Sequence, residues 1–179
     1  MSSDALSPSH DELALRARFS LLLVAPLSSL AQAGLSPILP KLSEHFAGQP
    51  AADTLIRLLV SSVLAAMILG SLGGGILADR YGQRRVLLWA LLGFAMAGTS
   101  GYFVDNLPGL LAGRILLGVF IAAANVIVAA MIANRLSKLL RDRWLGFFVV
   151  AGTGGAIAML IVVGVLGQRD WRLVFLLHL

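Results

Sequence analysis

The chain has 179 residues, of which 58% are hydrophobic and 13% charged, and its formal net charge is +5 at pH 7. So large an apolar fraction excludes an ordinary soluble domain and predicts a polytopic membrane protein in contact with the lipid bilayer. The basic residues lie between long apolar runs, which argues against a nucleic-acid partner, and the absence of cysteine excludes a disulfide framework and a thiol nucleophile.

The first 18 residues are polar and rich in serine, which predicts a disordered cytoplasmic tail. Arg16 and Arg18 close this tail and precede an apolar run over residues 19–39. Two basic residues before an apolar run also resemble a secretory signal, with residues 31–33 as the cleavage site. The run is too long for a signal peptide and four more spans follow it, so we predict a first membrane span.

A polar stripe is expected along this first span. Its members are Ser28, Ser29, Gln32 and Ser36. Steps of three and four residues place them on one side of a helix, and in lipid such a side has to face protein or water. Two readings stay open with similar weight: packing through small residues, and lining of a solute cavity with Gln32 as a candidate. Pro37 and Pro40 are expected to end the span before an outer loop over residues 41–57.

The second span is predicted over residues 58–78 and the third over residues 86–104, because neither run contains a charged residue. Gly70 and Gly74 are four residues apart in the second span. This spacing puts both glycines on one face and lets two helix backbones approach closely, which predicts a helix-packing role.

A short charged segment joins these two spans and reads G-I-L-A-D-R-Y-G-Q-R-R over residues 75–85. Its basic residues are typical of a cytoplasmic loop. A phosphate-binding loop is excluded because no G-K-[ST] follows the glycines. The residues that carry the motif are Gly75, Asp79, Arg80, Gly82, Arg84 and Arg85. The segment resembles the signature G-x-L-A-D-R-x-G-R-[RK]-x-x-L of the major facilitator superfamily of secondary transporters, with Gln83 replacing a basic residue.

The fourth span, residues 107–134, contains Arg114, the only ionisable residue deep inside a complete span. Insertion of such a cation costs about 2.5–3.5 kcal/mol, so its default interpretation is functional. Arg114 and Gly118 resemble the R-x-x-x-G pattern in the family's fourth helix, and Asn125 is predicted on nearly the same face. Gly118 is predicted to be a helix-packing residue, like Gly70 and Gly74. We predict that Arg114 and Asn125 face a central cavity; the alternative is an arginine that extends outward to lipid headgroups.

The fifth span is predicted over residues 144–168 and is rich in glycine. It lacks the G-P-x-x-G-G element of the family's drug:proton antiporters, which argues against a drug exporter. Residues 170–175 read D-W-R-L-V-F and resemble the W-R-x-x-F opening of the family's sixth helix, of which the sequence contains only the start. His178 in that start is predicted to be a structural position rather than a site.

Orientation follows from the basic residues, because lysine and arginine accumulate on the cytoplasmic side. Nine would lie inside: Arg16, Arg18, Arg80, Arg84, Arg85, Arg135, Lys138, Arg141 and Arg143. Four would lie outside: Lys41, Arg57, Arg169 and Arg172. This distribution predicts a cytoplasmic N-terminus, and we expect a bacterial inner membrane.

The resemblance covers residues 19–179 and implies an all-α transmembrane bundle of five complete spans plus the start of a sixth. It implies transport of a small solute by alternating access, coupled to protons, with a C-terminal half or partner subunit completing the cavity. Arg114 would serve the substrate charge or the coupling, and Asp79 with Arg80 would form a latch between the halves. The alternative is a non-transporting membrane fragment or a helix-packing partner subunit. We expect no cofactor, metal or enzymatic activity, because no catalytic set or metal-ligand spacing is present.

Overall fold

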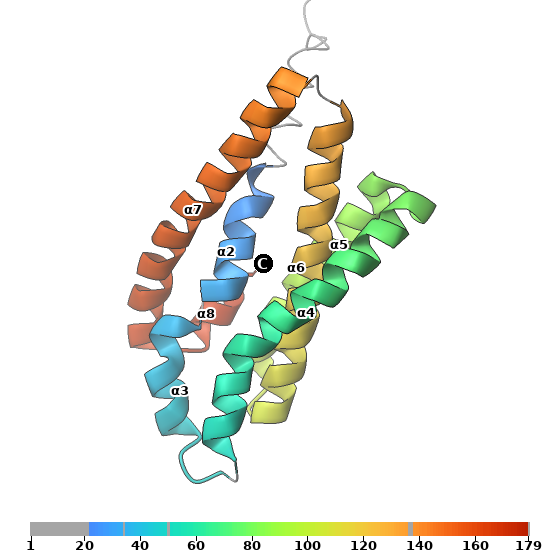
Figure 1. Ribbon diagram of the computed structural model, residues 1–179. Helices are drawn as coiled ribbons and strands as arrows, with labels where there is room; N and C mark the ends of the chain where they lie inside the picture. The colour runs from blue at the N-terminus through green and yellow to red at the C-terminus, as the bar shows by residue number, and fades with distance from the viewer. Residues whose placement is uncertain (1–21, 34, 50, 136–137, 179) are drawn as a thin grey trace, which may run out of the picture.

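The computed structural model describes residues 22–33, 35–49, 51–135 and 138–178, and the described part is a bundle of helices without strands (Figure 1). The elements are α2 (Val24–Ala33), the 3-10 helix η1 (Ser36–Ile38), α3 (Leu39–His45), α4 (Ala52–Tyr81), α5 (Gln83–Phe103), α6 (Leu107–Arg135), α7 (Lys138–Arg169) and α8 (Leu173–Leu176). Within this part, α4, α5, α6 and α7 are long and apolar enough to cross a membrane. The predicted all-α transmembrane bundle is confirmed, whereas the count of five complete spans stays a prediction.

The first predicted span is not one uninterrupted helix in its described part. The helix α2 ends at Ala33 and is followed by η1 and then by α3. Pro37 and Pro40 occupy the first turns of η1 and α3, where the missing N–H of proline costs no helical hydrogen bond. The start of this span and the tail over residues 1–18 lie outside the described residues.

The predicted outer loop over residues 41–57 was wrong for most of its length. Helix α3 continues to His45 and α4 begins at Ala52, six residues before the predicted start of the second span. The physical reason is burial: Leu42 and Phe46 are 0% and 2% exposed, so this segment gains apolar contacts by forming a short amphipathic helix.

Small residues let α4 and α6 approach each other closely. A Cβ atom added to Gly74 would lie 2.6 Å from Cα of Ala123, and one added to Gly118 would lie 2.7 Å from the carbonyl oxygen of Val63. Gly70 also abuts the backbone of α6. The structure therefore places all three predicted packing glycines in one interface, where any larger side chain would push the helices apart.

We expect Gly74→Val to destabilise the protein by about 1–3 kcal/mol, because the added atoms would overpack the contact with α6. The melting temperature of the detergent-purified protein measures this effect. Gly73→Val is the matched control, since a Cβ atom at Gly73 would meet nothing within 4 Å. Equal melting temperatures for the two variants would show that this helix contact is not tight.

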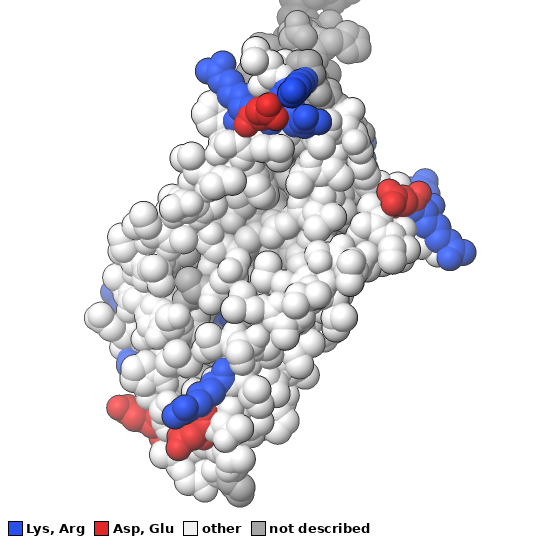
Figure 2. All heavy atoms as spheres, viewed as in Figure 1, with Lys and Arg blue, Asp and Glu red and all other residues white. Residues whose placement is uncertain are grey.

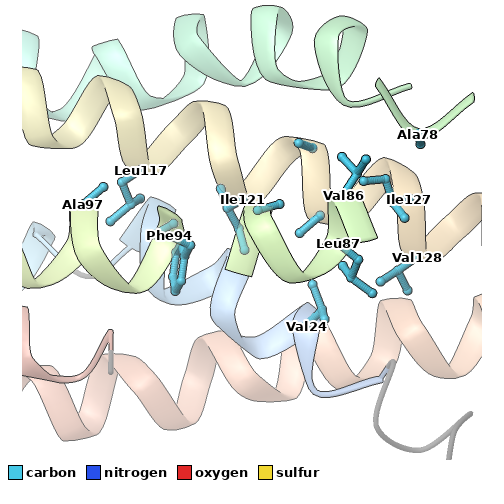
Figure 3. Close-up of a cluster of buried hydrophobic side chains, with 14 of the residues drawn as sticks. Val24, Ala78, Val86, Leu87, Phe94, Ala97, Leu117, Ile121, Ile127 and Val128 are labelled. Atoms are coloured by element: carbon cyan, nitrogen blue, oxygen red, sulfur yellow. The ribbon is translucent and has the colours of Figure 1, made fainter. Parts of the chain in front are cut away.

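Two apolar clusters fill the bundle at different levels. The first gathers around α5 and α6 with Val24 from α2, and Figure 3 shows its core side chains, including Phe94, Leu117 and Ile121. The second lies toward α3 and α8 and includes Leu110. Along α6, Leu110 therefore belongs to the second cluster and Leu117 to the first, so the boundary between the clusters lies between these two residues.

Charged side chains gather toward the ends of the molecule, with a broad band of uncharged atoms between them on the face that Figure 2 shows. Helix α6 is the central helix of the bundle. Of its most apolar 18 residues, 56% are buried, against 6% for the corresponding stretch of α7. The uncharged band matches a position in lipid, and the open side of α7 is available to lipid or to other protein.

Candidate functional site

The turn that carries the charged motif is shorter than predicted. Gly82 alone separates α4 from α5, with φ +90° and ψ 135°, a conformation that favours glycine. Asp79 and Arg80 consequently lie in the last turn of α4, while Arg84 and Arg85 lie in the first turn of α5. The prediction of these four charged residues in a loop was wrong, because one glycine suffices to reverse the chain direction.

Three of these charges oppose the helix dipoles. A carboxylate is disfavoured at a helix C-terminus and cations are disfavoured at an N-terminus, each by about 0.3–1 kcal/mol. Asp79 is exposed and makes no hydrogen bond or ion pair with any described residue, and Arg84 and Arg85 are exposed as well. Local stability therefore does not explain the presence of these three charges. The accumulation of basic residues on the cytoplasmic side accounts for the two arginines, whereas acidic residues contribute little to that effect.

Arg80 differs from its neighbours because it has an aromatic contact. Its guanidinium carbon lies 5.5 Å from the centre of the Tyr81 ring, and that ring lies 6.0 Å from the ring of Trp89. Gly75 is open, since an added Cβ atom would meet nothing within 4 Å. The motif thus forms an exposed surface at the joined ends of α4 and α5.

Arg114 lies inside the bundle at the level between the two apolar clusters. The residue is 3% exposed, and its Nη1 donates a hydrogen bond of 3.2 Å to the carbonyl oxygen of Ala31. Its guanidinium carbon lies 5.4 Å from the centre of the Phe175 ring. The side chain therefore lies among α2, α6 and α8 and does not extend to lipid headgroups.

The hydrogen bond from Arg114 has a local reason. Because α2 ends at Ala33, the carbonyl of Ala31 is among the last four of the helix, which lack an intrahelical partner. Arg114 satisfies this carbonyl and places a cation at the negative end of the helix dipole. One donor of the guanidinium is thus used to hold the end of α2, while Nη2 is buried without a partner among the described residues.

Three members of the polar stripe in the first span, Ser28, Ser29 and Gln32, have different surroundings. The hydroxyl of Ser28 lies 2.7 Å from the side-chain oxygen of Asn125 on α6, and Ser29 donates a bond of 2.7 Å to the carbonyl of Gly152 on α7. Gln32 is exposed and donates to the carbonyl of Ser28 over 3.3 Å. Two members of the stripe therefore join helices, and Gln32 alone of these three side chains faces outward.

Gly118, predicted as a packing residue on the same face as Arg114, has different neighbours from Arg114. Gly118 packs against α4, as described above, while Arg114 contacts α2 and Asn125 contacts Ser28 of the same helix. Residues on one side of a helix can contact different neighbours, because three helices surround α6. The structure brings Arg114 and Asn125 to α2 and leaves Gly118 as a packing residue.

His178, predicted to be a structural position, is buried. It is 2% exposed, its ring lies 5.3 Å from the ring of Phe94, and Gly98 lies directly against it. Its Nδ1 lies 3.1 Å from the carbonyl oxygen of Phe175, and its Nε2 has no partner among the described residues. Sequence analysis assigned His178 a structural position, and no local pattern indicated its contacts with Phe94 and Gly98.

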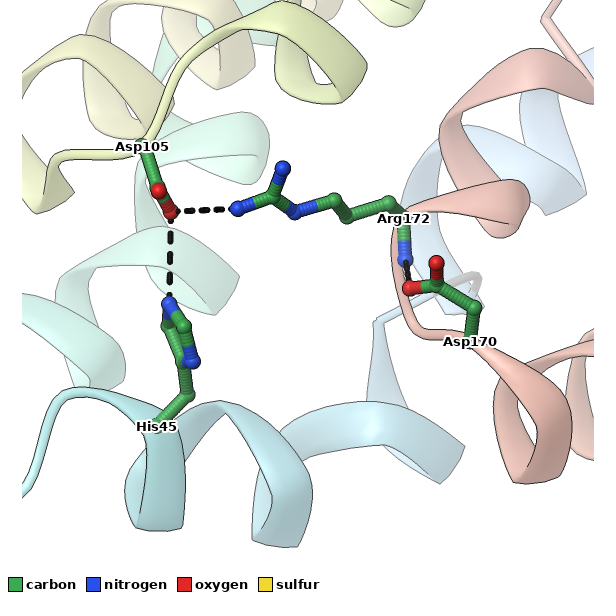
Figure 4. Close-up of polar contacts among 4 residues, drawn as sticks. All are labelled: His45, Asp105, Asp170 and Arg172. Carbon is green, nitrogen blue, oxygen red and sulfur yellow. Dashed lines mark hydrogen bonds and ion pairs between the residues drawn. The ribbon is translucent and has the colours of Figure 1, made fainter.

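An ionic cluster that sequence analysis missed lies at the opposite end from the charged turn. The Asp105 carboxylate accepts from Arg172 Nη2 at 2.8 Å and lies 3.2 Å from His45 Nε2 (Figure 4). Asp170 accepts from the Arg172 backbone N–H at 2.9 Å. This cluster ties α3 to the α5–α6 and α7–α8 turns. The hydrogen bond with His45, followed by Arg172, holds the pKa of Asp105 below its ordinary value.

The lowered pKa of Asp105 predicts that the folded state loses stability as the pH falls into the acidic range. The stabilisation from this carboxylate is fully present above the ordinary carboxyl pKa of about 3.9, and it is lost as the pH falls through the lowered value of the folded state. We expect Asp105→Asn to lower the melting temperature slightly at pH 7 and by less at pH 3. Glu44→Gln, another exposed carboxylate near His45, is the control. An equal difference at both pH values would contradict the ion-pair role.

No group of three or more His, Asp or Glu side chains in the described ranges could hold a metal ion.

A family model described as the Major Facilitator Superfamily matches residues 21–179. The Minor myo-inositol transporter IolF of Bacillus subtilis (strain 168) is 33% identical over 129 residues, which are 69% of this chain and 30% of that protein. The class G tetracycline resistance protein of Vibrio anguillarum is 32% identical over 152 residues, 82% of this chain and 37% of that protein.

The fold resembles the solved structure of the proton:xylose symporter XylE bound to 6-bromo-6-deoxy-D-glucose, with a TM-score of 0.74. The match covers 89% of this chain and 41% of that one at 23% identity, so it concerns the fold alone. The chain spans about a third of the length of the curated relatives that it matches.

Proposed function

We propose that this chain, which belongs to the major facilitator superfamily, supplies the N-terminal transmembrane part of a secondary active transporter. The whole protein would move a small solute across the membrane by alternating access, coupled to protons. The observation that carries this proposal is Arg114, a buried cation held where α2, α6 and α8 meet. Intramembrane charges are expensive to insert and mark solute or ion pathways by default.

The surroundings of Arg114 support a role in the transport cycle. Its guanidinium is anchored by one hydrogen bond to α2 and keeps a buried Nη2 that has no partner among the described residues. Such a group can offer a charged donor to a solute or to a carboxylate of the other half. Transporters commonly bind their solutes near the middle of the membrane where helices are interrupted, and α2 ends at this level.

Asp79 supports a second role, at the proposed cytoplasmic face. It is an exposed carboxylate at an unfavourable helix end, and no described residue pairs with it. We propose that it contacts a donor on the C-terminal half and holds the halves together in one state of the cycle. The guanidinium of the neighbouring Arg80 lies over the Tyr81 ring, and this contact keeps the Arg80 cation beside the proposed contact of Asp79.

We further propose that the N-terminus lies in the cytoplasm of a bacterial inner membrane. Figure 1 supports a common side for the α4–α5 turn and the α6–α7 turn, at which seven of the fourteen Lys and Arg residues lie. Single cysteines at Gln83 and Leu139 should therefore react from the cytoplasmic side, and one at Gln168 from the outside. The chain has no cysteine of its own to obscure the labelling. Reaction of Gln83 and Gln168 variants from the same side would overturn this orientation.

The test of transport uses the protein encoded by the complete reading frame, reconstituted into proteoliposomes with an imposed pH gradient. Myo-inositol, tetracycline and xylose, the solutes named for relatives, are the first probes. We expect gradient-driven accumulation of a small solute, abolished by a protonophore. A reading frame without further spans, or a well-reconstituted protein with no flux above empty liposomes for these and a wider solute panel, would favour the membrane fragment or partner subunit instead.

A further inference from the structure

A cavity lies between α3 and the first three turns of α4, at the opposite end of α4 from the charged turn. Its volume is about 410 Å³, and six residues line it: Leu39, Ser43, Asp53, Ile56, Arg57 and Val60. Figure 2 shows acidic and basic side chains over this end of α3 and α4. Pockets for small molecules have volumes of about 300–1,000 Å³, so the cavity has room for a ligand of that size.

The two charged side chains of this cavity are unpaired within the described part of the chain. Asp53 and Arg57 are four residues apart on α4, a spacing at which opposite charges can pair across one helical turn. Neither side chain makes an ion pair or a hydrogen bond with a described residue, and both residues are exposed. Both charges are therefore available to a partner.

Helix stability and topology explain Asp53 but not Arg57. Asp53 lies in the first turn of α4, where a carboxylate favours the helix dipole. Arg57 lies one turn further on, and the accumulation of basic residues on the cytoplasmic side does not account for a cation at this end. It directly precedes the uncharged run over residues 58–78, which as a helix is roughly 30 Å long, the thickness of the hydrocarbon core. Arg57 therefore lies at the level of the lipid headgroups.

The polar groups of the cavity define the charges that a ligand needs. The hydroxyl of Ser43 donates a hydrogen bond of 3.0 Å to the carbonyl of Leu39, so its oxygen stays available as an acceptor. Together with the carboxylate of Asp53, it suits an ammonium group, which has only donors. Arg57 also has only donors, and its planar fork suits a phosphate. The cavity thus matches a molecule that carries both an ammonium and a phosphate.

The rest of the cavity wall is apolar. Ile56 is buried, and Leu39 and Val60 are half-buried. Along α4 the order is the carboxylate of Asp53, then the cation of Arg57, then Val60 inside the uncharged run. A phospholipid with an ethanolamine headgroup presents its groups in the matching order, from the ammonium through the phosphate to the acyl chains.

We propose that this cavity binds a phospholipid with an ethanolamine headgroup. Arg57 binds the phosphate, and Asp53 with Ser43 accepts hydrogen bonds from the ammonium. The beginning of an acyl chain packs against Leu39 and Val60. The inference requires a position in the bilayer and does not depend on the proposed transport function. A contact with the rest of the protein is the competing occupant, and it would leave no preference among headgroups.

The test titrates the delipidated, detergent-purified complete protein with phospholipids that share their acyl chains and carry ethanolamine, choline or glycerol headgroups. Native mass spectrometry of the lipid-bound protein gives each Kd. We expect the ethanolamine lipid to bind about fivefold more tightly than the glycerol lipid, which lacks the ammonium. It should also bind more tightly than the choline lipid, whose quaternary ammonium has no N–H donor. Equal Kd values for the three lipids would overturn the proposal.

Free phosphoethanolamine distinguishes a lipid from a soluble ligand with the same headgroup. We expect it to bind at least about tenfold more weakly than the ethanolamine lipid, because it has no acyl chain to pack against the apolar wall. Binding of phosphoethanolamine as tight as that of the lipid would assign the cavity to a soluble zwitterion and would also overturn the proposal.

Variants assign the two charged contacts separately. Asp53→Asn should remove the preference for the ethanolamine lipid over the glycerol lipid and leave the binding of the glycerol lipid unchanged. Arg57→Gln should weaken the binding of all three lipids about fivefold, because each of them carries the phosphate. Arg141→Gln and Asp142→Asn are the matched controls, since these residues form an exposed ion pair of 3.6 Å near the start of α7. Wild-type Kd values for the Asp53 and Arg57 variants, or equal losses in the controls, would place the lipid elsewhere.

Discussion

Replacement of Arg114 by leucine should abolish transport while the protein remains inserted and abundant. Two effects on stability oppose each other in this variant. Removal of an intramembrane cation relieves an insertion cost of about 2.5–3.5 kcal/mol. The carbonyl of Ala31 loses its partner, and an unsatisfied buried acceptor costs about 1–3 kcal/mol. Because these magnitudes are similar, the net change in stability is small, and a loss of transport would report on function.

The measurement compares the initial uptake rate per inserted molecule in proteoliposomes for wild type, Arg114→Leu and Arg114→Lys. Lysine keeps the charge without the planar fork, so it cannot reproduce the bond to α2 and also offer a second fixed donor. We expect no detectable uptake for leucine and a rate at least about tenfold below wild type for lysine. A leucine variant that transports at the wild-type rate would show that Arg114 only packs between the helices.

Asp79→Asn should also stop transport, for a reason that acts at the surface rather than in the interior. Asp79 makes no hydrogen bond or ion pair with the described residues, so its neutral isostere loses nothing within this part of the fold. Removal of a carboxylate from the last turn of α4 even relieves an unfavourable dipole interaction of about 0.3–1 kcal/mol. A loss of transport at normal abundance would therefore locate the partner of Asp79 on the other half.

Asp142→Asn is the matched control for Asp79→Asn. Asp142 is another exposed carboxylate at the same proposed membrane face, and its partner is its neighbour Arg141 at 3.6 Å. We expect uptake within about twofold of wild type for this control, since exposed ion pairs contribute little. If both aspartate variants lose transport equally, the negative charge of this face matters rather than a specific contact. If neither does, Asp79 is an ordinary turn residue.

The membrane-spanning helices could be predicted from the sequence because span length and apolar composition are local properties. Predicted runs over residues 58–78, 86–104, 107–134 and 144–168 lie within α4, α5, α6 and α7, apart from one residue at the end of α5. The short helix α3 could not be found in this way, because its stability comes from burial of Leu42 and Phe46 against distant residues.

The candidate site could be predicted only in part. Arg114 is evident as a charge in an apolar run, but its partner Ala31 is 83 positions away, and the apolar helices carry little periodicity that fixes their rotation. Membrane helices are hydrophobic on most sides, so the sequence does not state which side faces a neighbour. For the same reason the contacts of His178 and of Asp105 follow from the packing of α8 and the turns, and no local pattern indicates them.

The most direct test of the central claim, alternating access, is a counterflow measurement on the complete protein. Proteoliposomes are preloaded with an unlabelled solute that the protein accumulates, without a pH gradient, and the entry of a trace of labelled solute is followed. A carrier exposes its site to one side at a time, so we predict a transient overshoot of label that is absent in Arg114→Leu. Entry of label that only approaches equilibrium, with the same time course whether or not the liposomes are preloaded, would contradict alternating access.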